Sequence, residues 1–224
     1  GQYSEMDIIS FYKKNRKVII DNAQAFYTKP LVGVDTIYTC RKFLGVPDGG
    51  YLYTTSDCEY ELEQDESYGR IQFLAGRFER TAQDFYELYR ENERVIDALP
   101  LKRMSKITHN LLRGVDYEKQ IGIREKNFRC LNSHLEENNL LKITVPVGPY
   151  MYPYYVKDGV FLRKKLQDEK IYIPVLWPNV KEDLCATDTE YQLSDNILPI
   201  PCDQRYTVDD MNYIIKIIKR MEDL

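Results

Sequence analysis

The stretch that decides the fold reads Val-Ile-Ile-Asp-Asn-Ala-Gln and spans residues 18–24. A β-branched run ends at Ile20, and Asp21-Asn22 closes it as the polar end of a strand. On an extended chain residues two apart share a face, so Asp21 and Ala23 are expected to point the same way. A carboxylate beside a methyl group suits a flat aromatic cofactor, because the acid can meet a ring nitrogen while the methyl lies under the ring. Taken alone, however, a strand ending in a solvated Asp-Asn turn is the preferred reading.

Two later stretches extend this pattern. In Thr39-Cys40-Arg41-Lys42, a hydroxyl three residues before a lysine can bind the phosphate of a molecule whose aldehyde the lysine holds. By itself this stretch also fits a strand that finishes in two solvated basic residues. Residues 45–50 read Gly-Val-Pro-Asp-Gly-Gly, and paired glycines let the backbone approach a ligand closely. On its own, that segment is a turn.

The first hundred residues alternate between helical and strand patterns, which indicates an α/β fold. Ser4 and Asp7 form a capping box that opens a short helix, and residues 17–20 follow as a strand. This is half of a parallel α/β unit, the kind that binds ligands at the carboxyl ends of its strands. Further strands are expected at 38–43 and 50–54. A helix is expected over 81–99, ended by Pro100, with a buried stripe of Phe85, Leu88, Tyr89, Val95 and Ile96.

The second half begins with a long helix over 116–137, whose apolar positions are Ile121, Phe128, Leu131 and Leu135. Strands are expected at 141–147, 153–156 and 171–176, and a helix at 158–167 with Asp158 as its N-cap. Residues 207–210 form a capping box that opens a last helix, with Met211, Ile214, Ile215 and Ile218 on one side. The domain boundary is expected between Pro100 and Asp116, which gives domains of residues 1–110 and 111–224.

Composition excludes several classes of function. The net charge of −4 gives no electrostatic footprint for nucleic acid, and no stretch has the apolar length of a membrane span or reads as a signal peptide. A cytoplasmic protein is therefore expected. The five cysteines are scattered and the two histidines have no ligand partners at suitable spacing, which argues against a structural metal site and a disulfide framework. The 19 tyrosines are interpreted as packing and interface residues.

In this order and spacing, the three N-terminal stretches resemble the fold-type I pyridoxal-phosphate enzymes, and within them the DegT-type sugar aminotransferases. Gly1-Gln2, followed by Met6-Asp7 and Ile9, is similar to the family segment that leads into this Asp. The second half carries further similar elements: Tyr152-Pro153, Leu162-Arg163-x-x-Leu166, Leu176-Trp177-Pro178, Leu198-Pro199-Ile200 and Asp209-Asp210-Met211. The resemblance implies the C-terminal part of a pyridoxal-phosphate-binding large domain, followed by a small C-terminal α/β domain.

The resemblance also implies a role for each site residue. Lys42 would bind the aldehyde of pyridoxal 5'-phosphate covalently and would later move the proton between substrate and cofactor. Asp21 would pair with the pyridinium nitrogen, Ala23 would pack against the ring, and Gln24 would hydrogen-bond near the phenolic oxygen. Thr39 would help to hold the phosphate. No metal is implied.

The family activity implied for the chain is transfer of an amino group from an amino acid, glutamate being expected, to a nucleotide-linked keto-sugar, as in polysaccharide biosynthesis. A keto-cyclitol acceptor is one alternative. Another is a truncated or degenerate module that lacks catalysis and serves dimerisation or partner binding.

Some features depart from the family pattern. Family members carry a long segment ahead of the position where this sequence starts, so the start is interpreted as a cut through the domain. The connection from Asp21 to Lys42 is shorter than is usual in the family, and the sequence of the turn at 45–50 differs from the commoner family sequence. The family implies a homodimer whose partner subunit contacts cofactor or substrate. Asn110 and Arg113 lie in the corresponding region, although a polar loop explains them better, and a surface salt bridge explains Arg41 equally well.

Overall fold

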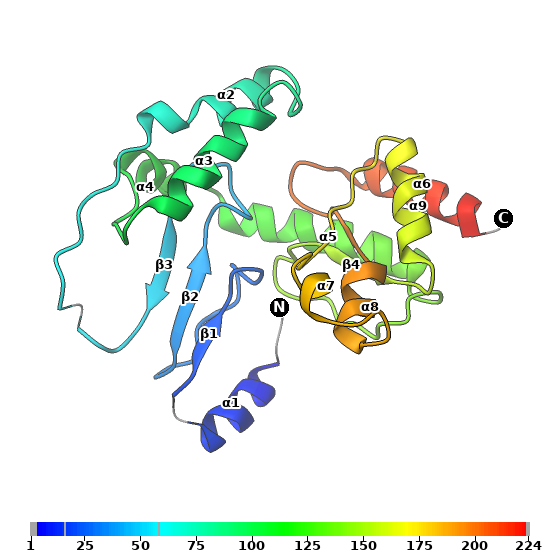
Figure 1. Cartoon of the computed structure of the whole chain (residues 1–224), viewed down its shortest axis with the longest axis horizontal. Helices are drawn as coiled ribbons and strands as arrows, with labels where there is room; N and C mark the ends of the chain where they lie inside the picture. The colour runs from blue at the N-terminus through cyan, green and yellow to red at the C-terminus, as the bar shows by residue number, and fades with distance from the viewer. Residues whose placement is uncertain (1–3, 16, 58, 223–224) are drawn as a thin grey trace. The chain divides into compact units, whose positions relative to one another are not determined.

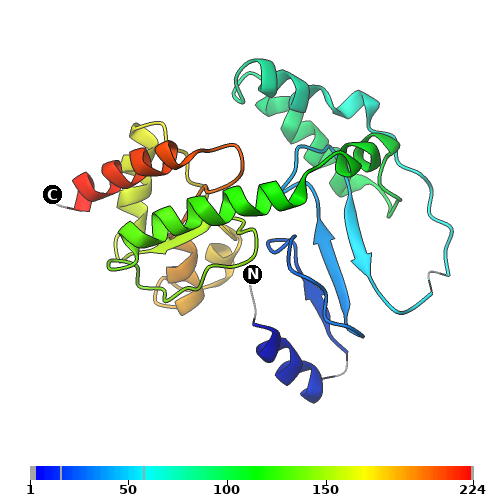
Figure 2. The same cartoon turned by 180° about the vertical axis from the view of Figure 1, so that it is seen from behind.

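The computed structural model describes residues 4–15, 17–57 and 59–222, and the chain divides into two compact units, residues 1–116 and 117–224 (Figures 1 and 2). Gly1 and Gln2, which contributed to the family resemblance, lie outside the described residues. The boundary expected after residue 110 falls inside helix α4, Lys106–Arg113, and the two units part three residues beyond that helix. Each unit is described by itself below.

Unit 1 contains a three-stranded sheet in the order β1-β2-β3. Helix α1, Glu5–Lys14, precedes it and begins as predicted, because the Ser4 hydroxyl accepts a hydrogen bond from the Asp7 N–H. Strand β1, Ile19–Asp21, runs parallel to β2, Asp35–Thr39, and β3, Gly50–Tyr53, runs antiparallel to β2. The arrowheads of β1 and β2 point to the end of the sheet where α3 and α4 lie (Figures 1 and 2).

The predicted strand at 38–43 was wrong in its second half. Strand β2 ends at Thr39, and the Phe43 and Leu44 N–H groups both donate to the Cys40 carbonyl, which makes residues 40–44 a tight turn. The sequence misleads here because Cys40, Phe43, Leu44 and Val46 are all buried, so an apolar segment reads like a strand although it is a folded loop.

The helices of unit 1 follow the sheet. A 3₁₀ turn, Tyr68–Arg70, leads into α2, Gln72–Glu79, and then come α3, Tyr86–Ala98, and α4. Helix α3 begins later than expected, and its predicted buried stripe was wrong in part. Leu88 and Tyr89 are exposed, whereas the residue of α3 that is buried is Asn92. A polar side chain therefore anchors this helix to unit 1.

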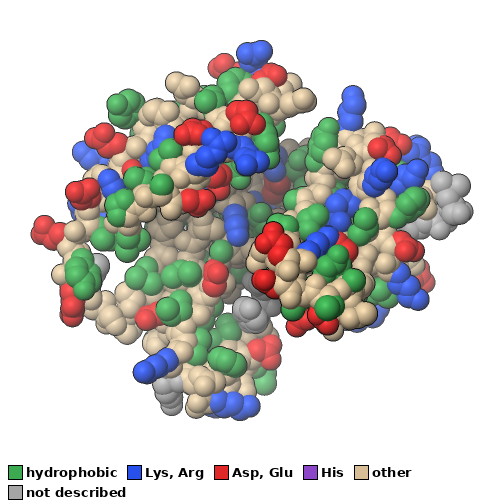
Figure 3. Space-filling view, in the orientation of Figure 1, with side chains coloured by type: hydrophobic (Ala, Val, Ile, Leu, Met, Phe, Trp, Pro, Cys, Tyr) green, Lys and Arg blue, Asp and Glu red, His purple; other side chains and the backbone are tan. Residues whose placement is uncertain are grey.

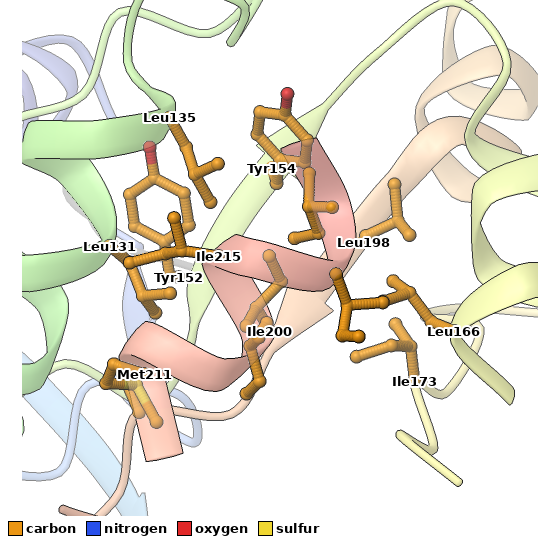
Figure 4. Close-up of a cluster of buried hydrophobic side chains, with 14 of the residues drawn as sticks. Leu131, Leu135, Tyr152, Tyr154, Leu166, Ile173, Leu198, Ile200, Met211 and Ile215 are labelled. Carbon is orange, nitrogen blue, oxygen red and sulfur yellow. The ribbon is translucent and has the colours of Figure 1, made fainter. Parts of the chain in front are cut away.

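Unit 2 is built around the long helix α5, Tyr117–Leu135, which confirms the predicted helix. The unit also contains an antiparallel strand pair, made of β4, Tyr152–Tyr155, and β5, Ile197–Ile200. Three helices lie between these strands in the sequence, and one follows β5. Phe128, Leu131 and Leu135 of α5 pack against β4, β5 and the last helix in one apolar core (Figure 4). The remaining helices are α6, Gly159–Asp168; α7, Val180–Asp183; α8, Thr189–Asn196; and α9, Val208–Glu222.

The start of α9 confirms the predicted capping box, since Thr207 and Asp210 exchange hydrogen bonds. Two strand predictions in unit 2 were wrong. At 141–147, the Asn139 side chain accepts from the N–H groups of Leu141 and Tyr155 and so occupies the edge of β4. At 171–176, Pro174 has no N–H to offer to a strand ladder.

The surface is that of a mixed-charge protein. Lys/Arg and Asp/Glu side chains alternate over the visible face of each unit (Figure 3). Within the described residues, no helix is both long and apolar enough to cross a membrane. In that same part of the chain, no group of three or more histidine, cysteine or acidic side chains is arranged to hold a metal ion.

Gly159 is the residue on which the start of α6 depends. A Cβ there would lie 2.4 Å from the backbone of Asn196, whose side chain caps the helix by accepting from the Gly159 N–H at 2.9 Å. The predicted cap, Asp158, makes no side-chain capping bond. We expect Gly159→Ala to destabilise unit 2 by about 1–3 kcal/mol, because backbone must shift to admit the methyl group.

The matched control is Gly122→Ala in α5, where an added Cβ meets open space. There the higher helix propensity of alanine should stabilise the protein by about 0.5–1 kcal/mol. Denaturant unfolding followed by fluorescence of Trp177, the single tryptophan, reports on unit 2. Equal midpoints for the two variants would refute the packing argument.

Candidate functional site

The register of the parallel strands places Asp21 and Thr39 at one end of the sheet. Asp21 is the last residue of β1 and lies opposite Ile37, two residues before the end of β2 at Thr39. Because paired residues share a face and side chains alternate along a strand, both side chains belong to the same face. Strand spacing and rise put their Cα atoms about 8 Å apart. Ile19, Ile37 and Leu52 of this face are exposed, so the face is open within unit 1.

The chain turns immediately after Asp21. The Ala23 N–H donates to Asp21 Oδ1 at 2.8 Å, and the Ala25 N–H donates to the Asn22 carbonyl at 3.0 Å. An aspartate side chain that binds the backbone two residues on forms a local turn in place of a longer strand. The strand alternation expected to align Asp21 with Ala23 therefore ends at Asp21. Ala23 and Gln24 are half-buried in the turn, and Asp21 is exposed with one carboxylate oxygen held in place.

Lys42 lies in a loop whose other side chains are mostly buried. The loop runs from Cys40 to Gly49 and is closed by the Cys40 N–H, which donates to the Gly49 carbonyl at 3.1 Å. Phe43 and Leu44 turn inward, whereas Lys42 is exposed. Burial of its neighbours holds the backbone of this loop and leaves the lysine amine accessible at the same sheet end as Thr39, three residues earlier.

Helix α3 makes two contacts with the loop that carries Lys42. The Asn92 Nδ2 donates to the Pro47 carbonyl at 2.8 Å, and Arg41 forms an ion pair with Glu93. Neither Asn92 nor Glu93 was predicted from the sequence to have a role. A polar residue in the middle of an apolar helical stripe was the available signal, since a buried asparagine needs partners.

A buried charge cluster lies beside this contact. Arg70 pairs with Asp65, lies 3.9 Å from Asp48, and donates to Asn92 Oδ1 at 3.2 Å. Asp48 is buried and also accepts from the Ser105 N–H at 3.2 Å, at the start of α4. The single positive charge of Arg70 faces the two negative charges of Asp48 and Asp65. The N-terminal end of α4, which carries a partial positive charge, compensates part of the excess negative charge. Asp48 therefore ties the loop to α4, a role that the sequence did not indicate.

Cys40, beside Thr39, is not a nucleophile in this fold. Its side chain is fully buried. Burial, together with the nearby Asp48 carboxylate, raises the pKa of the Cys40 thiol to about 12, so the thiolate is scarce at neutral pH.

The paired glycines are required by the protein's own packing. Gly49 has φ +101°, and an added Cβ would lie 2.9 Å from the Thr108 methyl group; at Gly50 it would lie 2.7 Å from the Tyr38 carbonyl oxygen. The close backbone approach that the sequence assigned to a ligand is thus made to α4 and to β2. The approach of a ligand to these glycines stays a prediction.

An open cavity of about 1130 Å³ in unit 1 is lined in part by Ile37, Thr39 and Leu52 of the sheet face that Asp21 also occupies. It is bordered by β2, β3 and the segment 96–109, and its walls are mostly apolar. Of the predicted cofactor residues only Thr39 lines it. Asp21 and Lys42 are not among its lining residues.

The remaining candidates have simpler positions. Arg41 forms the ion pair with Glu93 described above, which agrees with the salt-bridge reading. Asn110 and Arg113 are exposed on α4, so the polar loop expected around them was wrong. Capping by Ser105, whose hydroxyl accepts from the Thr108 N–H, explains why this segment is helical.

Neither a protein-family model nor a curated protein sequence matches the chain. Solved structures do match its fold. A DegT DnrJ EryC1 StrS aminotransferase from Brucella abortus is 16% identical, with a TM-score of 0.59 over 98% of this chain and 61% of that one. The sugar aminotransferase CalS13 from Micromonospora echinospora is 15% identical, with a TM-score of 0.58 over 98% and 64% of the two chains.

A third structure is the PLP form of Spr1654 from Streptococcus pneumoniae, which is described as a sugar aminotransferase. It is 15% identical, with a TM-score of 0.57 over 95% of this chain and 60% of that one. These likenesses confirm the predicted fold, that of part of a pyridoxal-phosphate-dependent aminotransferase of the DegT type. The chain spans about 60% of the length of these structures.

Gly49 offers a test of the loop's packing. We expect Gly49→Ala to destabilise unit 1 by about 1–3 kcal/mol, because alanine is strained at this positive φ and its methyl group meets Thr108. Gly45→Ala, where a Cβ meets nothing within 4 Å, is the matched control and should change little. Thermal unfolding measures the cost, and amide exchange over residues 40–50 locates it. Comparable effects of both variants would contradict the assignment.

Proposed function

We propose that this chain is part of a pyridoxal-phosphate-dependent aminotransferase that transfers an amino group from an amino acid to a nucleotide-linked keto-sugar. The observation that carries the proposal is the placement of a carboxylate, a hydroxyl and a lysine at one end of a parallel strand pair, in a fold shared with sugar aminotransferases. Ligands of open α/β sheets bind at the carboxyl ends of strands, where Asp21 and Thr39 lie.

The donor set fits the cofactor. Pyridoxal phosphate has a ring nitrogen, an aldehyde and a phosphate, and when bound it supplies an acceptor for the amino group and a ring that withdraws electrons. An exposed carboxylate, an exposed amine and a half-buried hydroxyl are present at the sheet end to meet these three groups.

Each residue has a defined task in the proposed site. Asp21, oriented by the Ala23 N–H, holds the proton of the ring nitrogen. Lys42 would anchor the cofactor and, once the amino donor has displaced it, would carry a proton at Nζ between the substrate carbon and the cofactor. Thr39 donates its hydroxyl to a phosphate oxygen. Ala23 and Gln24, in the turn after Asp21, border the ring.

The rest of the proposal concerns the whole protein. Glutamate is the proposed donor, a homodimer the proposed assembly, and the cytoplasm the proposed location. The names of the solved relatives support a sugar as acceptor for those proteins, and the proposal extends that to this one.

The first test is spectroscopic. The full-length protein mixed with pyridoxal phosphate should develop the absorption band of a lysine-bound cofactor, and borohydride reduction should fix the cofactor to Lys42 in the peptide map. Lys42→Ala should abolish both, because no other amine occupies that loop. Lys29→Ala, which removes another exposed lysine of unit 1, is the control and should change neither.

Asp21→Asn should keep the covalent link and lower turnover by about 10- to 100-fold, the equivalent of about 1.5–3 kcal/mol for a hydrogen bond to a charged group. A wild-type spectrum identical to that of Lys42→Ala would reject the mechanism and favour the non-catalytic module.

The acceptor class needs a separate assay. With glutamate as donor, nucleotide-linked keto-sugars and free keto-cyclitols should be compared as amino acceptors by formation of 2-oxoglutarate. We expect turnover with the nucleotide-linked sugar. Turnover with the cyclitol alone would refute the proposed substrate while leaving the cofactor chemistry intact.

A further inference from the structure

Two neighbouring residues of α3 hold the loop on either side of Lys42. On one side Arg41, which precedes the lysine, pairs with Glu93. On the other side Pro47, five residues after it, accepts a hydrogen bond from Asn92 at 2.8 Å. The lysine thus lies between two attachment points on a single turn of one helix.

The Asn92 contact has a defined orientation. Arg70 can only donate, and its guanidinium lies 3.2 Å from Asn92 Oδ1, so this oxygen is the acceptor and Nδ2 is the group that meets the Pro47 carbonyl. Asn92 is 2% exposed, which shields both bonds from water. Each side of the amide therefore has one partner, and the side chain cannot turn over without losing both bonds.

The loop transmits the position of Pro47 to Lys42. Cys40, Phe43, Leu44 and Val46 are buried and close-packed, and the Cys40–Gly49 hydrogen bond closes the loop at its base. Because packed interiors transmit strain, the positions of Pro47 and of the Lys42 backbone are coupled. A shift of the Pro47 carbonyl consequently shifts the backbone that carries the lysine.

We propose that Asn92 is a positioning residue for Lys42, acting through Pro47 and assisted by the Glu93–Arg41 pair. This inference rests on the proposed function, because positioning has meaning only for a lysine that reacts. Its consequence is that a residue remote from the cofactor sets the catalytic rate. Displacement of a reacting group by about 1 Å can cost about 100-fold in rate.

The main variant is Asn92→Asp. It keeps the oxygen that accepts from Arg70 and replaces the donor at Pro47 with an oxygen, which faces the carbonyl with like partial charge. The matched control is Asn127→Asp in unit 2. Asn127 is also a buried helical asparagine whose Nδ2 donates to loop carbonyls, those of Cys202, Asp203 and Tyr206.

The full-length protein loaded with pyridoxal phosphate is compared in three ways. For Asn92→Asp we expect kcat to fall about 10- to 100-fold with little change in KM for the amino donor. We also expect faster amide exchange at Phe43 and Leu44, and a changed absorption band of the lysine-bound cofactor. Asn127→Asp should lose stability but keep the wild-type kcat, band and exchange at these two amides.

Glu93→Gln is the second variant, in case Asn92→Asp does not fold. It breaks the partly exposed ion pair with Arg41 without leaving a buried charge, and a drop in kcat of about two- to fivefold is expected.

The outcomes separate the two proposals. A wild-type protein without a Lys42-dependent band refutes the proposed function, and the positioning role with it. A wild-type band with unchanged kcat and spectrum in Asn92→Asp, or unchanged kcat in Glu93→Gln where Asn92→Asp does not fold, refutes the positioning role alone. So does an equal loss of kcat in Asn127→Asp, since the effect would then follow from general destabilisation.

Discussion

The parallel pairing of β1 with β2 is the constraint on which the candidate site depends. The register that sets Asp21 opposite Ile37 places the ends of both strands side by side, and it fixes which face each side chain occupies. A shift of one residue would turn Asp21 and Thr39 to opposite faces, because strand side chains alternate. The carboxylate and the hydroxyl thus share one surface by virtue of backbone hydrogen bonds, before any contact between them. Residues 22–34, which connect the strands, can be short because they need only return the chain to the start of β2.

The second constraint is the polar interior behind the Lys42 loop. A partly buried arginine beside two carboxylates is a weak source of net stability, since desolvation offsets much of the attraction. Such polar groups instead favour particular geometries, because each hydrogen bond needs a partner at a defined position. Arg70, Asp48 and Asn92 each have specific partners, namely Asp65, the Ser105 N–H and the Pro47 carbonyl, and these can be satisfied by one arrangement of loop and helices. An apolar interior of the same volume would allow the loop several positions. These three polar side chains therefore favour one backbone conformation of the Lys42 loop.

These contacts also show why the sequence revealed some features and concealed others. Several local signals were confirmed: the capping boxes at Ser4 and Thr207 and the apolar face of α5 depend on residues three or four apart, whereas Asp158 was wrong as a cap. Features set by distant partners were missed. The inward turn after Cys40 depends on packing, the burial of Asn92 on Pro47, and the absence of a strand at 141–147 on the side chain of Asn139. That Asp21 and Thr39 lie at one end of the sheet could be predicted from the sequence, because the carboxyl ends of parallel strands lie at one edge.

The proposed chemistry requires that the reacting side chains be oriented and that water be excluded from them. The contacts within unit 1 bear on the first requirement. Asp21 Oδ1 is held by the Ala23 N–H, Thr39 by the strand register, and the backbone of Lys42 by a loop with buried side chains. Yet Asp21 and Lys42 are both exposed, and the sheet face beside them is open. Charge stabilisation and proton transfer gain most where water is excluded. The proposed chemistry would therefore gain from a ligand that displaces water from Asp21 and Lys42 when it binds. The packed loop matters for that reason, because it limits the backbone movement of Lys42 before such a ligand binds.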